Sequence, residues 1–174
     1  LATISKVHAL PASNLSVEPL TEKRGAETGL YIRELNLMQI ASEQPKANFV
    51  HEFGHFMDGT LGGGAYATSG HSGVPPVLKG WFNAVNETPS YQQLLTEDPS
   101  VFNTYFRDSA EVFARTYAQW IAVRSEDTAL LQELTDAGET WSEGEFKPIA
   151  AELDLLFADT IRKYNQNHDP DDGK

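Results

Sequence analysis

Residues 48–58 read Asn48-Phe49-Val50-His51-Glu52-Phe53-Gly54-His55-Phe56-Met57-Asp58. A capping-type residue, Ser42, and a proline at position 45 precede this stretch, and three glycines follow from position 62. These are start and stop signals of a helix. We therefore predict a helix from Pro45 to Gly59 or Leu61. Its apolar face should pack into the core through Phe49, Val50, Phe53, Phe56 and Met57.

This helix contains the pattern His-Glu-x-x-His. Residues four apart on a helix lie on the same face, so His51 and His55 can aim their ring nitrogens at one point. Glu52 lies about 100° around the helix axis from His51, beside that point. The arrangement suits a zinc ion with two histidine ligands, together with a carboxylate that acts on a zinc-bound water.

Composition limits the kinds of site and partner. The chain has 174 residues, about the length of one domain, and no cysteine. A zinc site must then use His, Asp or Glu, which favours an open catalytic site over a closed structural one. The net charge of −12 argues against nucleic-acid or anionic-membrane partners. No apolar run approaches the roughly 20 residues that span a bilayer. No signal peptide is recognisable, and the first residue, Leu1, predicts a piece of a longer polypeptide.

The rest of the chain predicts an α+β fold that is mostly helical. Residues 1–28 should be mostly loop, and residues 29–40 a strand or one arm of a hairpin. Helical spacing predicts two short helices within 77–95, separated at Pro89, and further helices over 108–124, 128–135 and 145–164. We expect a single domain over residues 1–164 and a polar tail over 165–174.

A zinc site of this kind needs a third protein ligand. The metzincin pattern would require glycine at position 58 and histidine at position 61, whereas this chain has Asp58 and Leu61. The gluzincin pattern requires a glutamate on a second helix, and Glu111 fits it. The neighbours of Glu111 on one helix face are small, which would let the two helices approach closely: Ala110, Ala114 and Ala118.

Two other side chains are candidates for a role at this site. His71 is an alternative third ligand, although it lies in a loop rich in glycine and serine. Asp58, three residues after His55, either orients a ligand as a supporting carboxylate or only lies near the helix end. His8 and His168 lie in segments that look peripheral, and neither receives a role.

Two blocks of this sequence resemble a known family. Residues 51–58, together with residues 105–117 (Tyr105-Phe106-Arg107-Asp108-Ser109-Ala110-Glu111-Val112-Phe113-Ala114-Arg115-Thr116-Tyr117), resemble the catalytic domain of anthrax lethal factor and its relatives. They are also similar to metallopeptidase-like domains of phage minor-head proteins and large mobile-element polyproteins. The resemblance implies a zincin with a small sheet and an active-site helix. It also implies one zinc ion held by His51, His55 and Glu111, a base at Glu52, and a tyrosine facing the zinc, here Tyr105.

The expected function is zinc-dependent hydrolysis of a peptide bond. The expected substrate is a protein or peptide in extended form, which can pair with the strand within residues 29–40. An alternative is a non-catalytic zinc-bound structural or docking module of a phage or mobile-element protein. A third interpretation, a toxin or effector protease carried on a larger polypeptide, shares the chemistry and differs in its partner.

Overall fold

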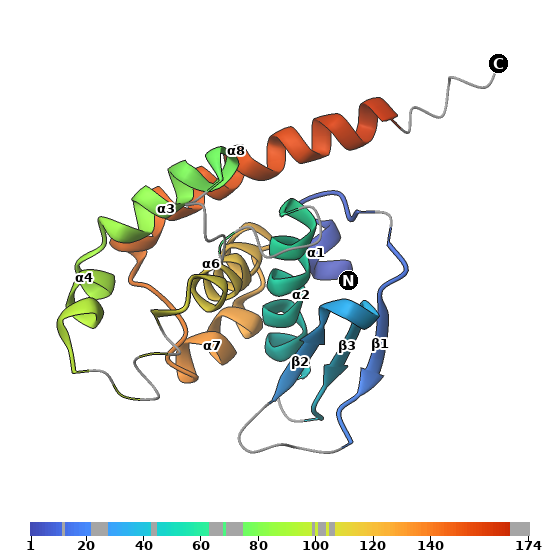
Figure 1. Ribbon diagram of the computed structural model, residues 1–174, viewed down its shortest axis with the longest axis horizontal. Coiled ribbons are helices and arrows are strands. Elements are labelled where there is room, and N and C mark those ends of the chain that lie inside the picture. Colours follow the sequence, from blue (N-terminus) through green and yellow to red (C-terminus); the bar gives the residue numbers. More distant parts are fainter. Residues whose placement is uncertain are drawn as a thin grey trace.

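The computed structural model describes residues 1–11, 13–21, 28–42, 45–62, 68, 75–98, 100, 104 and 107–167, with side chains up to residue 158. This part of the chain is mostly helical with one small sheet (Figure 1), so the α+β expectation is confirmed. The predicted loop over residues 1–28 contains a short helix, α1 (Ala2–Ser5), and a strand, β1 (Ser16–Pro19).

The sheet has three strands in the order β1-β3-β2. Strand β1 runs parallel to β3 (Leu37–Ile40), and β2 (Gly29–Ile32) runs antiparallel to β3. The expectation of one strand or hairpin arm over residues 29–40 is therefore corrected, because the segment supplies two strands that pair with each other. A short 3-10 helix (Arg33–Leu35) and Asn36, in the left-handed conformation with φ 47°, reverse the chain between them. Asparagine tolerates this conformation better than most residues.

The helices follow the sequence signals closely. Helix α2 spans Pro45–Leu61 and α6 spans Ser109–Arg124, as predicted. The segment around residues 77–95 forms η2 (Pro76–Leu78), α3 (Lys79–Asn86) and α4 (Pro89–Thr96). Pro89 starts α4 because a proline at the first helical position needs no N–H partner. Helix α7 spans Thr128–Asp136.

Helix α8 is longer than predicted. It runs from Glu143 to Asn167, whereas the sequence suggested 145–164 followed by a polar tail. Pro148 falls in the first two turns of this helix. The intrahelical ladder has already begun by then, since the N–H of Phe146 donates to the carbonyl of Ser142, so Pro148 removes the one hydrogen bond that an N–H there would donate to residue 144. The remainder of the predicted tail, residues 168–174, lies outside the described residues.

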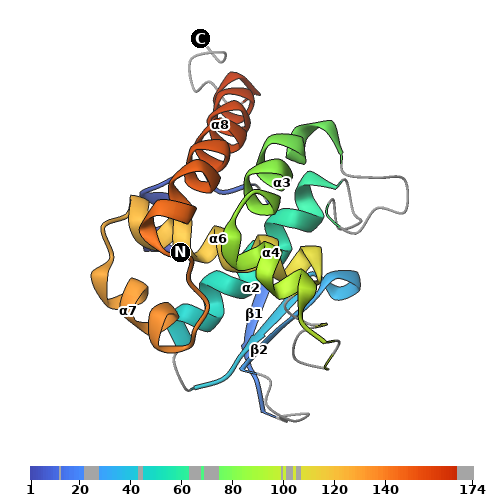
Figure 2. The ribbon, with the colours of Figure 1, turned by 90° about the vertical axis from the view of Figure 1, so that its left-hand side faces the viewer.

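Helix α2 lies between the sheet and α6 (Figures 1 and 2), and its most extensive packing is against α6. The two backbones approach closely at Gly54, where an added Cβ would lie 2.7 Å from the Cα of Ala114. Of the three small residues predicted to allow such an approach, Ala114 lies at the contact with Gly54. Helix α8 packs on α3 and α6 and covers the side of α6 away from the sheet.

The predicted core face of α2 is largely confirmed, since Val50, Phe53, Phe56 and Met57 are buried and Phe49 is half-buried. His8 is also buried, at 3% exposure, so its segment is not peripheral as the sequence suggested. No helix in the described ranges is long and apolar enough to cross a bilayer.

Candidate metal centre

Helix α2 presents His51 and His55 one turn apart on the face that meets α6. Both side chains are buried, and their ring centroids lie 5.0 Å apart with the ring planes at 77°. A separation of four residues gives this alignment on any regular helix. Helix α6 packs over this face and shields both rings from solvent.

Helix α6 supplies the carboxylate that completes the cluster. Its N-cap is Asp108, whose side chain accepts a hydrogen bond from the N–H of Ala110 at 2.8 Å. This cap fixes the first turn, which contains Glu111. The Glu111 carboxylate lies 3.3 Å from Nε2 of His51 through Oε2, and 3.3 Å from Nε2 of His55 through Oε1. The structure therefore brings together the three residues that the sequence pattern predicted as ligands.

The three side chains fit the requirements of a metal ion. One ligand atom from each lies within 4.8 Å of the others, and no other such group occurs in the described part of the chain. A tetrahedral ion with bonds of about 2.0–2.1 Å places its ligand atoms about 3.3 Å apart, and the Nε2 of each histidine lies at that distance from one oxygen of Glu111. Oε2 of Glu111 is also buried without a hydrogen-bond partner among the described residues. A cation between these atoms would remove that unfavourable state.

Electrostatic interactions within the cluster favour the charged forms of both His51 and Glu111. Burial acts to lower the pKa of His51, but contact with Glu111 and the charges of Glu52 and Glu139 outweigh it and raise that pKa. Burial acts to raise the pKa of Glu111, but the two imidazoles outweigh it and hold that pKa well below its usual range. A carboxylate that stays ionised is what a cation site requires.

Glu52 lies beside the cluster, buried at 8% exposure. Its side chain packs against strand β2, where a Cβ added to Gly29 would lie 2.7 Å from Glu52 Cγ. The backbone N–H of Tyr31 donates a hydrogen bond to its carboxylate. Burial raises the pKa of Glu52, which the charges of His51 and His55 only partly offset. The strand thus holds this carboxylate in place, an interaction that the sequence did not predict.

The other predicted site residues fare differently. Asp58 is fully buried and accepts hydrogen bonds from the backbone N–H and the hydroxyl of Thr68, so it holds the chain that follows α2. Its suggested role in orienting a ligand stays a prediction. Tyr105 and the alternative ligand His71 lie outside the described residues, as does His168.

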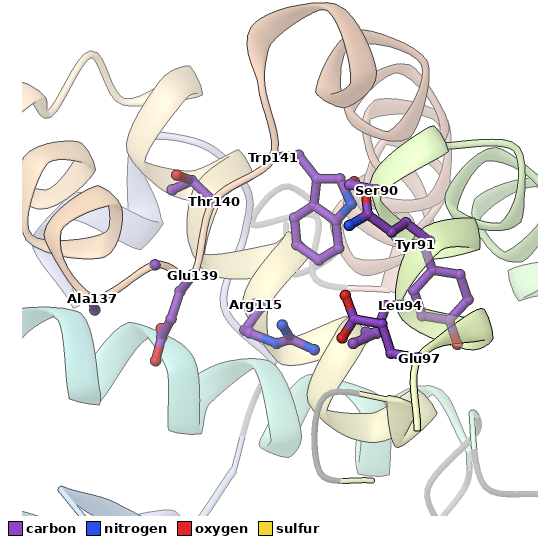
Figure 3. A pocket seen from close by; sticks show the side chains of 11 residues that line it. Ser90, Tyr91, Leu94, Glu97, Arg115, Ala137, Glu139, Thr140 and Trp141 are labelled. Carbon is purple, nitrogen blue, oxygen red and sulfur yellow. The ribbon is translucent and has the colours of Figure 1, made fainter. Parts of the chain in front are cut away.

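A pocket of about 420 Å³ lies close to the cluster. Its lining comes from α4, from Arg115 on α6 and from residues 137–141 between α7 and α8 (Figure 3). The guanidinium of Arg115 lies 5.6 Å from the ring centroid of Trp141. Glu139 connects the pocket with the metal-binding cluster, because it lines the pocket and its Oε2 lies 3.8 Å from Nδ1 of His51. No signal in the sequence indicated a role for Glu139 at this site.

Comparisons with protein-family models, with curated proteins and with solved structures give no match to this chain.

Proposed function

We propose that this chain is a zinc-dependent endopeptidase of the zincin type, related to the lethal factor-like metallopeptidases. One observation carries the proposal: two imidazoles on α2 and a carboxylate on α6 converge in a buried cluster, with a second, buried carboxylate, Glu52, beside them. A cluster of nitrogen and oxygen ligands is typical of catalytic zinc, whereas thiolates are common in structural sites. A purely structural site would have no use for the buried Glu52.

In this proposal His51, His55 and Glu111 hold the zinc. Zinc supplies Lewis acidity there, which activates water and polarises the peptide carbonyl. Glu52 accepts the proton of the attacking water and later delivers it to the leaving amine. Its burial and its hydrogen bond from Tyr31 keep the carboxylate beside the cluster. Tyr105, outside the described residues, is proposed to donate a hydrogen bond to the tetrahedral oxyanion.

The position of strand β2 supports an extended peptide as the substrate. Among the strands that the structure describes, β2 is at the edge of the sheet and pairs only with β3. The N–H of Tyr31 is directed to Glu52, so the edge of the strand not occupied by β3 faces the proposed base. An extended peptide can add to such an edge through backbone hydrogen bonds. A peptide bound there would run past Glu52 and the cluster.

The proposal is tested with purified wild type and Glu52→Gln. We expect wild type to contain one zinc per chain by elemental analysis and to cleave members of a peptide library. Glu52→Gln should retain zinc, because Glu52 does not face the ligand atoms, and should lose cleavage by at least about 100-fold, the typical contribution of a general base.

Each other outcome has a defined meaning. If native mass spectrometry shows that the wild-type chain does not bind added zinc, the whole proposal is overturned. Zinc binding without cleavage of any library member would favour a non-catalytic zinc-bound module. Equal cleavage by wild type and Glu52→Gln would contradict the role of Glu52 as the base.

A further inference from the structure

Nδ1 of His51 is buried and has no hydrogen-bond partner among the described residues. Nε2 of His51 faces Glu111, and the other ring nitrogen, Nδ1, points away from the cluster. Among the described residues no group accepts a hydrogen bond from Nδ1. Histidines that bind metal almost always donate the second ring N–H to a carboxylate, a carbonyl or a water, which fixes the tautomer and the ring orientation. His51 therefore requires an acceptor at Nδ1.

Glu139 is the carboxylate that lies closest to meeting this requirement. Its Oε2 is 3.8 Å from Nδ1 of His51, about 1 Å longer than a good hydrogen bond. The side chain of His51 is 10% exposed and that of Glu139 is 30% exposed, so the contact is partly shielded from water. Because Glu139 faces Nδ1, it does not compete with Glu111 for a metal on the Nε2 side.

The backbone on the N-terminal side of Glu139 is fixed by the end of α7. Gly138 adopts φ 74°, a left-handed conformation that favours glycine. The N–H of Gly138 donates to the carbonyl of Thr135, and the N–H of Glu139 donates to the carbonyl of Leu134, both at 3.0 Å. This pair of bonds is a Schellman motif, which closes the helix in a defined geometry.

The backbone on the C-terminal side is fixed as well. Two residues after Glu139, Trp141 exchanges two hydrogen bonds with the side-chain amide of Gln119 on α6. Its N–H donates to Oε1 of Gln119 at 2.9 Å, and its carbonyl accepts from Nε2 at 3.0 Å. Glu139 thus lies between two anchored points, and Figure 3 shows its side chain extending toward the ribbon of α2.

We propose that Glu139 is a positioning residue for His51. Its carboxylate accepts a hydrogen bond from Nδ1–H of His51. This fixes the ring proton on Nδ1 and leaves Nε2 unprotonated and directed toward the metal. The remaining gap closes by rotation of the Glu139 side chain, whose backbone needs no movement. The proposal rests on the metal site of the proposed function, and it assigns to Glu139 an effect on metal affinity without any contact with the metal.

The test compares Glu139→Ala and Glu139→Gln with wild type, and Glu143→Ala serves as the control. Glu143 is an exposed glutamate at the start of α8, so its removal changes the net charge equally. Zinc affinity is measured by competition with a chromogenic chelator. We expect Glu139→Ala to weaken zinc binding about 10- to 100-fold. Glu139→Gln should restore most of the affinity, because its amide oxygen still accepts a hydrogen bond. Glu143→Ala should match wild type.

A second measurement separates positioning from loss of structure. Imidazole ¹⁵N NMR of zinc-loaded wild type and Glu139→Gln should show His51 protonated at Nδ1, with a downfield N–H proton signal. In Glu139→Ala this signal should be weaker or should exchange faster with water. If Glu139→Ala does not fold, the Gln variant decides alone: a lost Nδ1–H signal with unchanged affinity would overturn the proposal. Unchanged affinity in Glu139→Ala would overturn it while leaving the metal site intact. A wild-type chain without zinc would overturn the proposed function itself.

Discussion

At the scale of single residues, the candidate site depends on which atoms face each other across α2 and α6. The shared carboxylate of Glu111 contacts both imidazoles at 3.3 Å, so it joins the two helices at one point. A ligand carried on a packed helix loses less conformational freedom on metal binding than a ligand on a loop. This difference favours Glu111 as third ligand over His71, which lies outside the described residues and which the sequence predicts to be in a loop.

Replacement of Glu111 by alanine should therefore weaken zinc affinity by orders of magnitude, while helix α6 persists because alanine favours helix. The same replacement at His71 should leave zinc affinity nearly unchanged. Chelator competition on both purified variants measures the difference. Equal losses, or a loss only for His71→Ala, would show that the gluzincin assignment is wrong.

A second residue-scale prediction concerns Gly29, where an added Cβ would lie 2.7 Å from Cγ and 2.8 Å from Oε1 of Glu52. Gly29→Ala should displace the Glu52 side chain, so cleavage should fall while zinc content stays at one per chain. Gly144→Ala is the matched control, because a Cβ there meets no atom within 4 Å. Unchanged cleavage in Gly29→Ala would mean that the position of Glu52 is not critical for the reaction.

The sequence predicted some of these residues and not others, for a physical reason. His51, Glu52 and His55 are related by helical periodicity, which is a local property of the sequence. Glu111 followed from the search for a glutamate on a second helix. Gly29 and Glu139 reach the site only through tertiary packing, of the sheet and of α7 against α2. No local pattern records such contacts.

At the scale of elements, the pair α2 and α6 sets the distance between the ligands. Small residues on α6 predicted a close approach, and Ala114 lies at the contact. The partner on α2 is Gly54, between the two histidines, and its packing role became visible only in the structure. A glycine inside a helix costs about 1 kcal/mol relative to alanine. Its presence here is explained by the space that the second helix needs.

Gly54→Ala should accordingly be destabilising, against the normal helix preference for alanine. The new Cβ would overlap with backbone atoms of Ala114, which cannot rotate away, and overpacking of this kind costs about 1–3 kcal/mol. Zinc affinity should fall as well, because His55 and Glu111 move apart with the helices. Urea unfolding and chelator competition measure the two effects. Stability equal to or above that of wild type would contradict the close approach.

The sheet shows where element prediction from sequence failed. Residues 29–40 are rich in strand formers, so they suggested one strand or one arm of a hairpin, yet two four-residue strands with a 3-10 helix between them are observed. Leu35 lies in that 3-10 helix and is exposed. Only Asn36, in the left-handed conformation, hinted at a reversal, and asparagine alone is a weak turn signal.

At the scale of the whole molecule, the segment after α1 connects to the helical layer through His8. Its ring stacks on Phe157 of α8, with ring centroids 4.6 Å apart, and on Trp120 of α6, at 5.7 Å. Nδ1 of His8 donates to the carbonyl of Ala9 at 2.7 Å, because a carbonyl can only accept. Nε2 therefore accepts the hydroxyl proton of Tyr117, also at 2.7 Å, in the neutral ring.

This geometry predicts how stability depends on pH. Burial lowers the pKa of His8, and the hydrogen bond to Ala9 offsets this lowering only in part. The titratable side chain described in contact with the His8 ring is Tyr117, and burial raises the pKa of Tyr117. The unfolded chain then binds a proton at higher pH than the folded one does. The contribution of neutral His8 is thus complete above the ordinary histidine pKa of about 6.5 and is lost as pH falls from there toward the lower folded pKa.

The double variant His8→Phe/Tyr117→Phe isolates this contribution, because it keeps the stacked rings and leaves no buried hydroxyl without a partner. His8→Phe alone should cost about 1–3 kcal/mol, the penalty of an unpaired buried hydroxyl at Tyr117. Urea unfolding between pH 8 and pH 5.5 should show a steeper loss of stability for wild type than for the double variant. All carboxylates are common to both proteins, so the difference between the two curves belongs to His8. Parallel curves would mean that His8 binds its proton equally well folded and unfolded, and that the neutral ring deduced from its two hydrogen bonds is wrong.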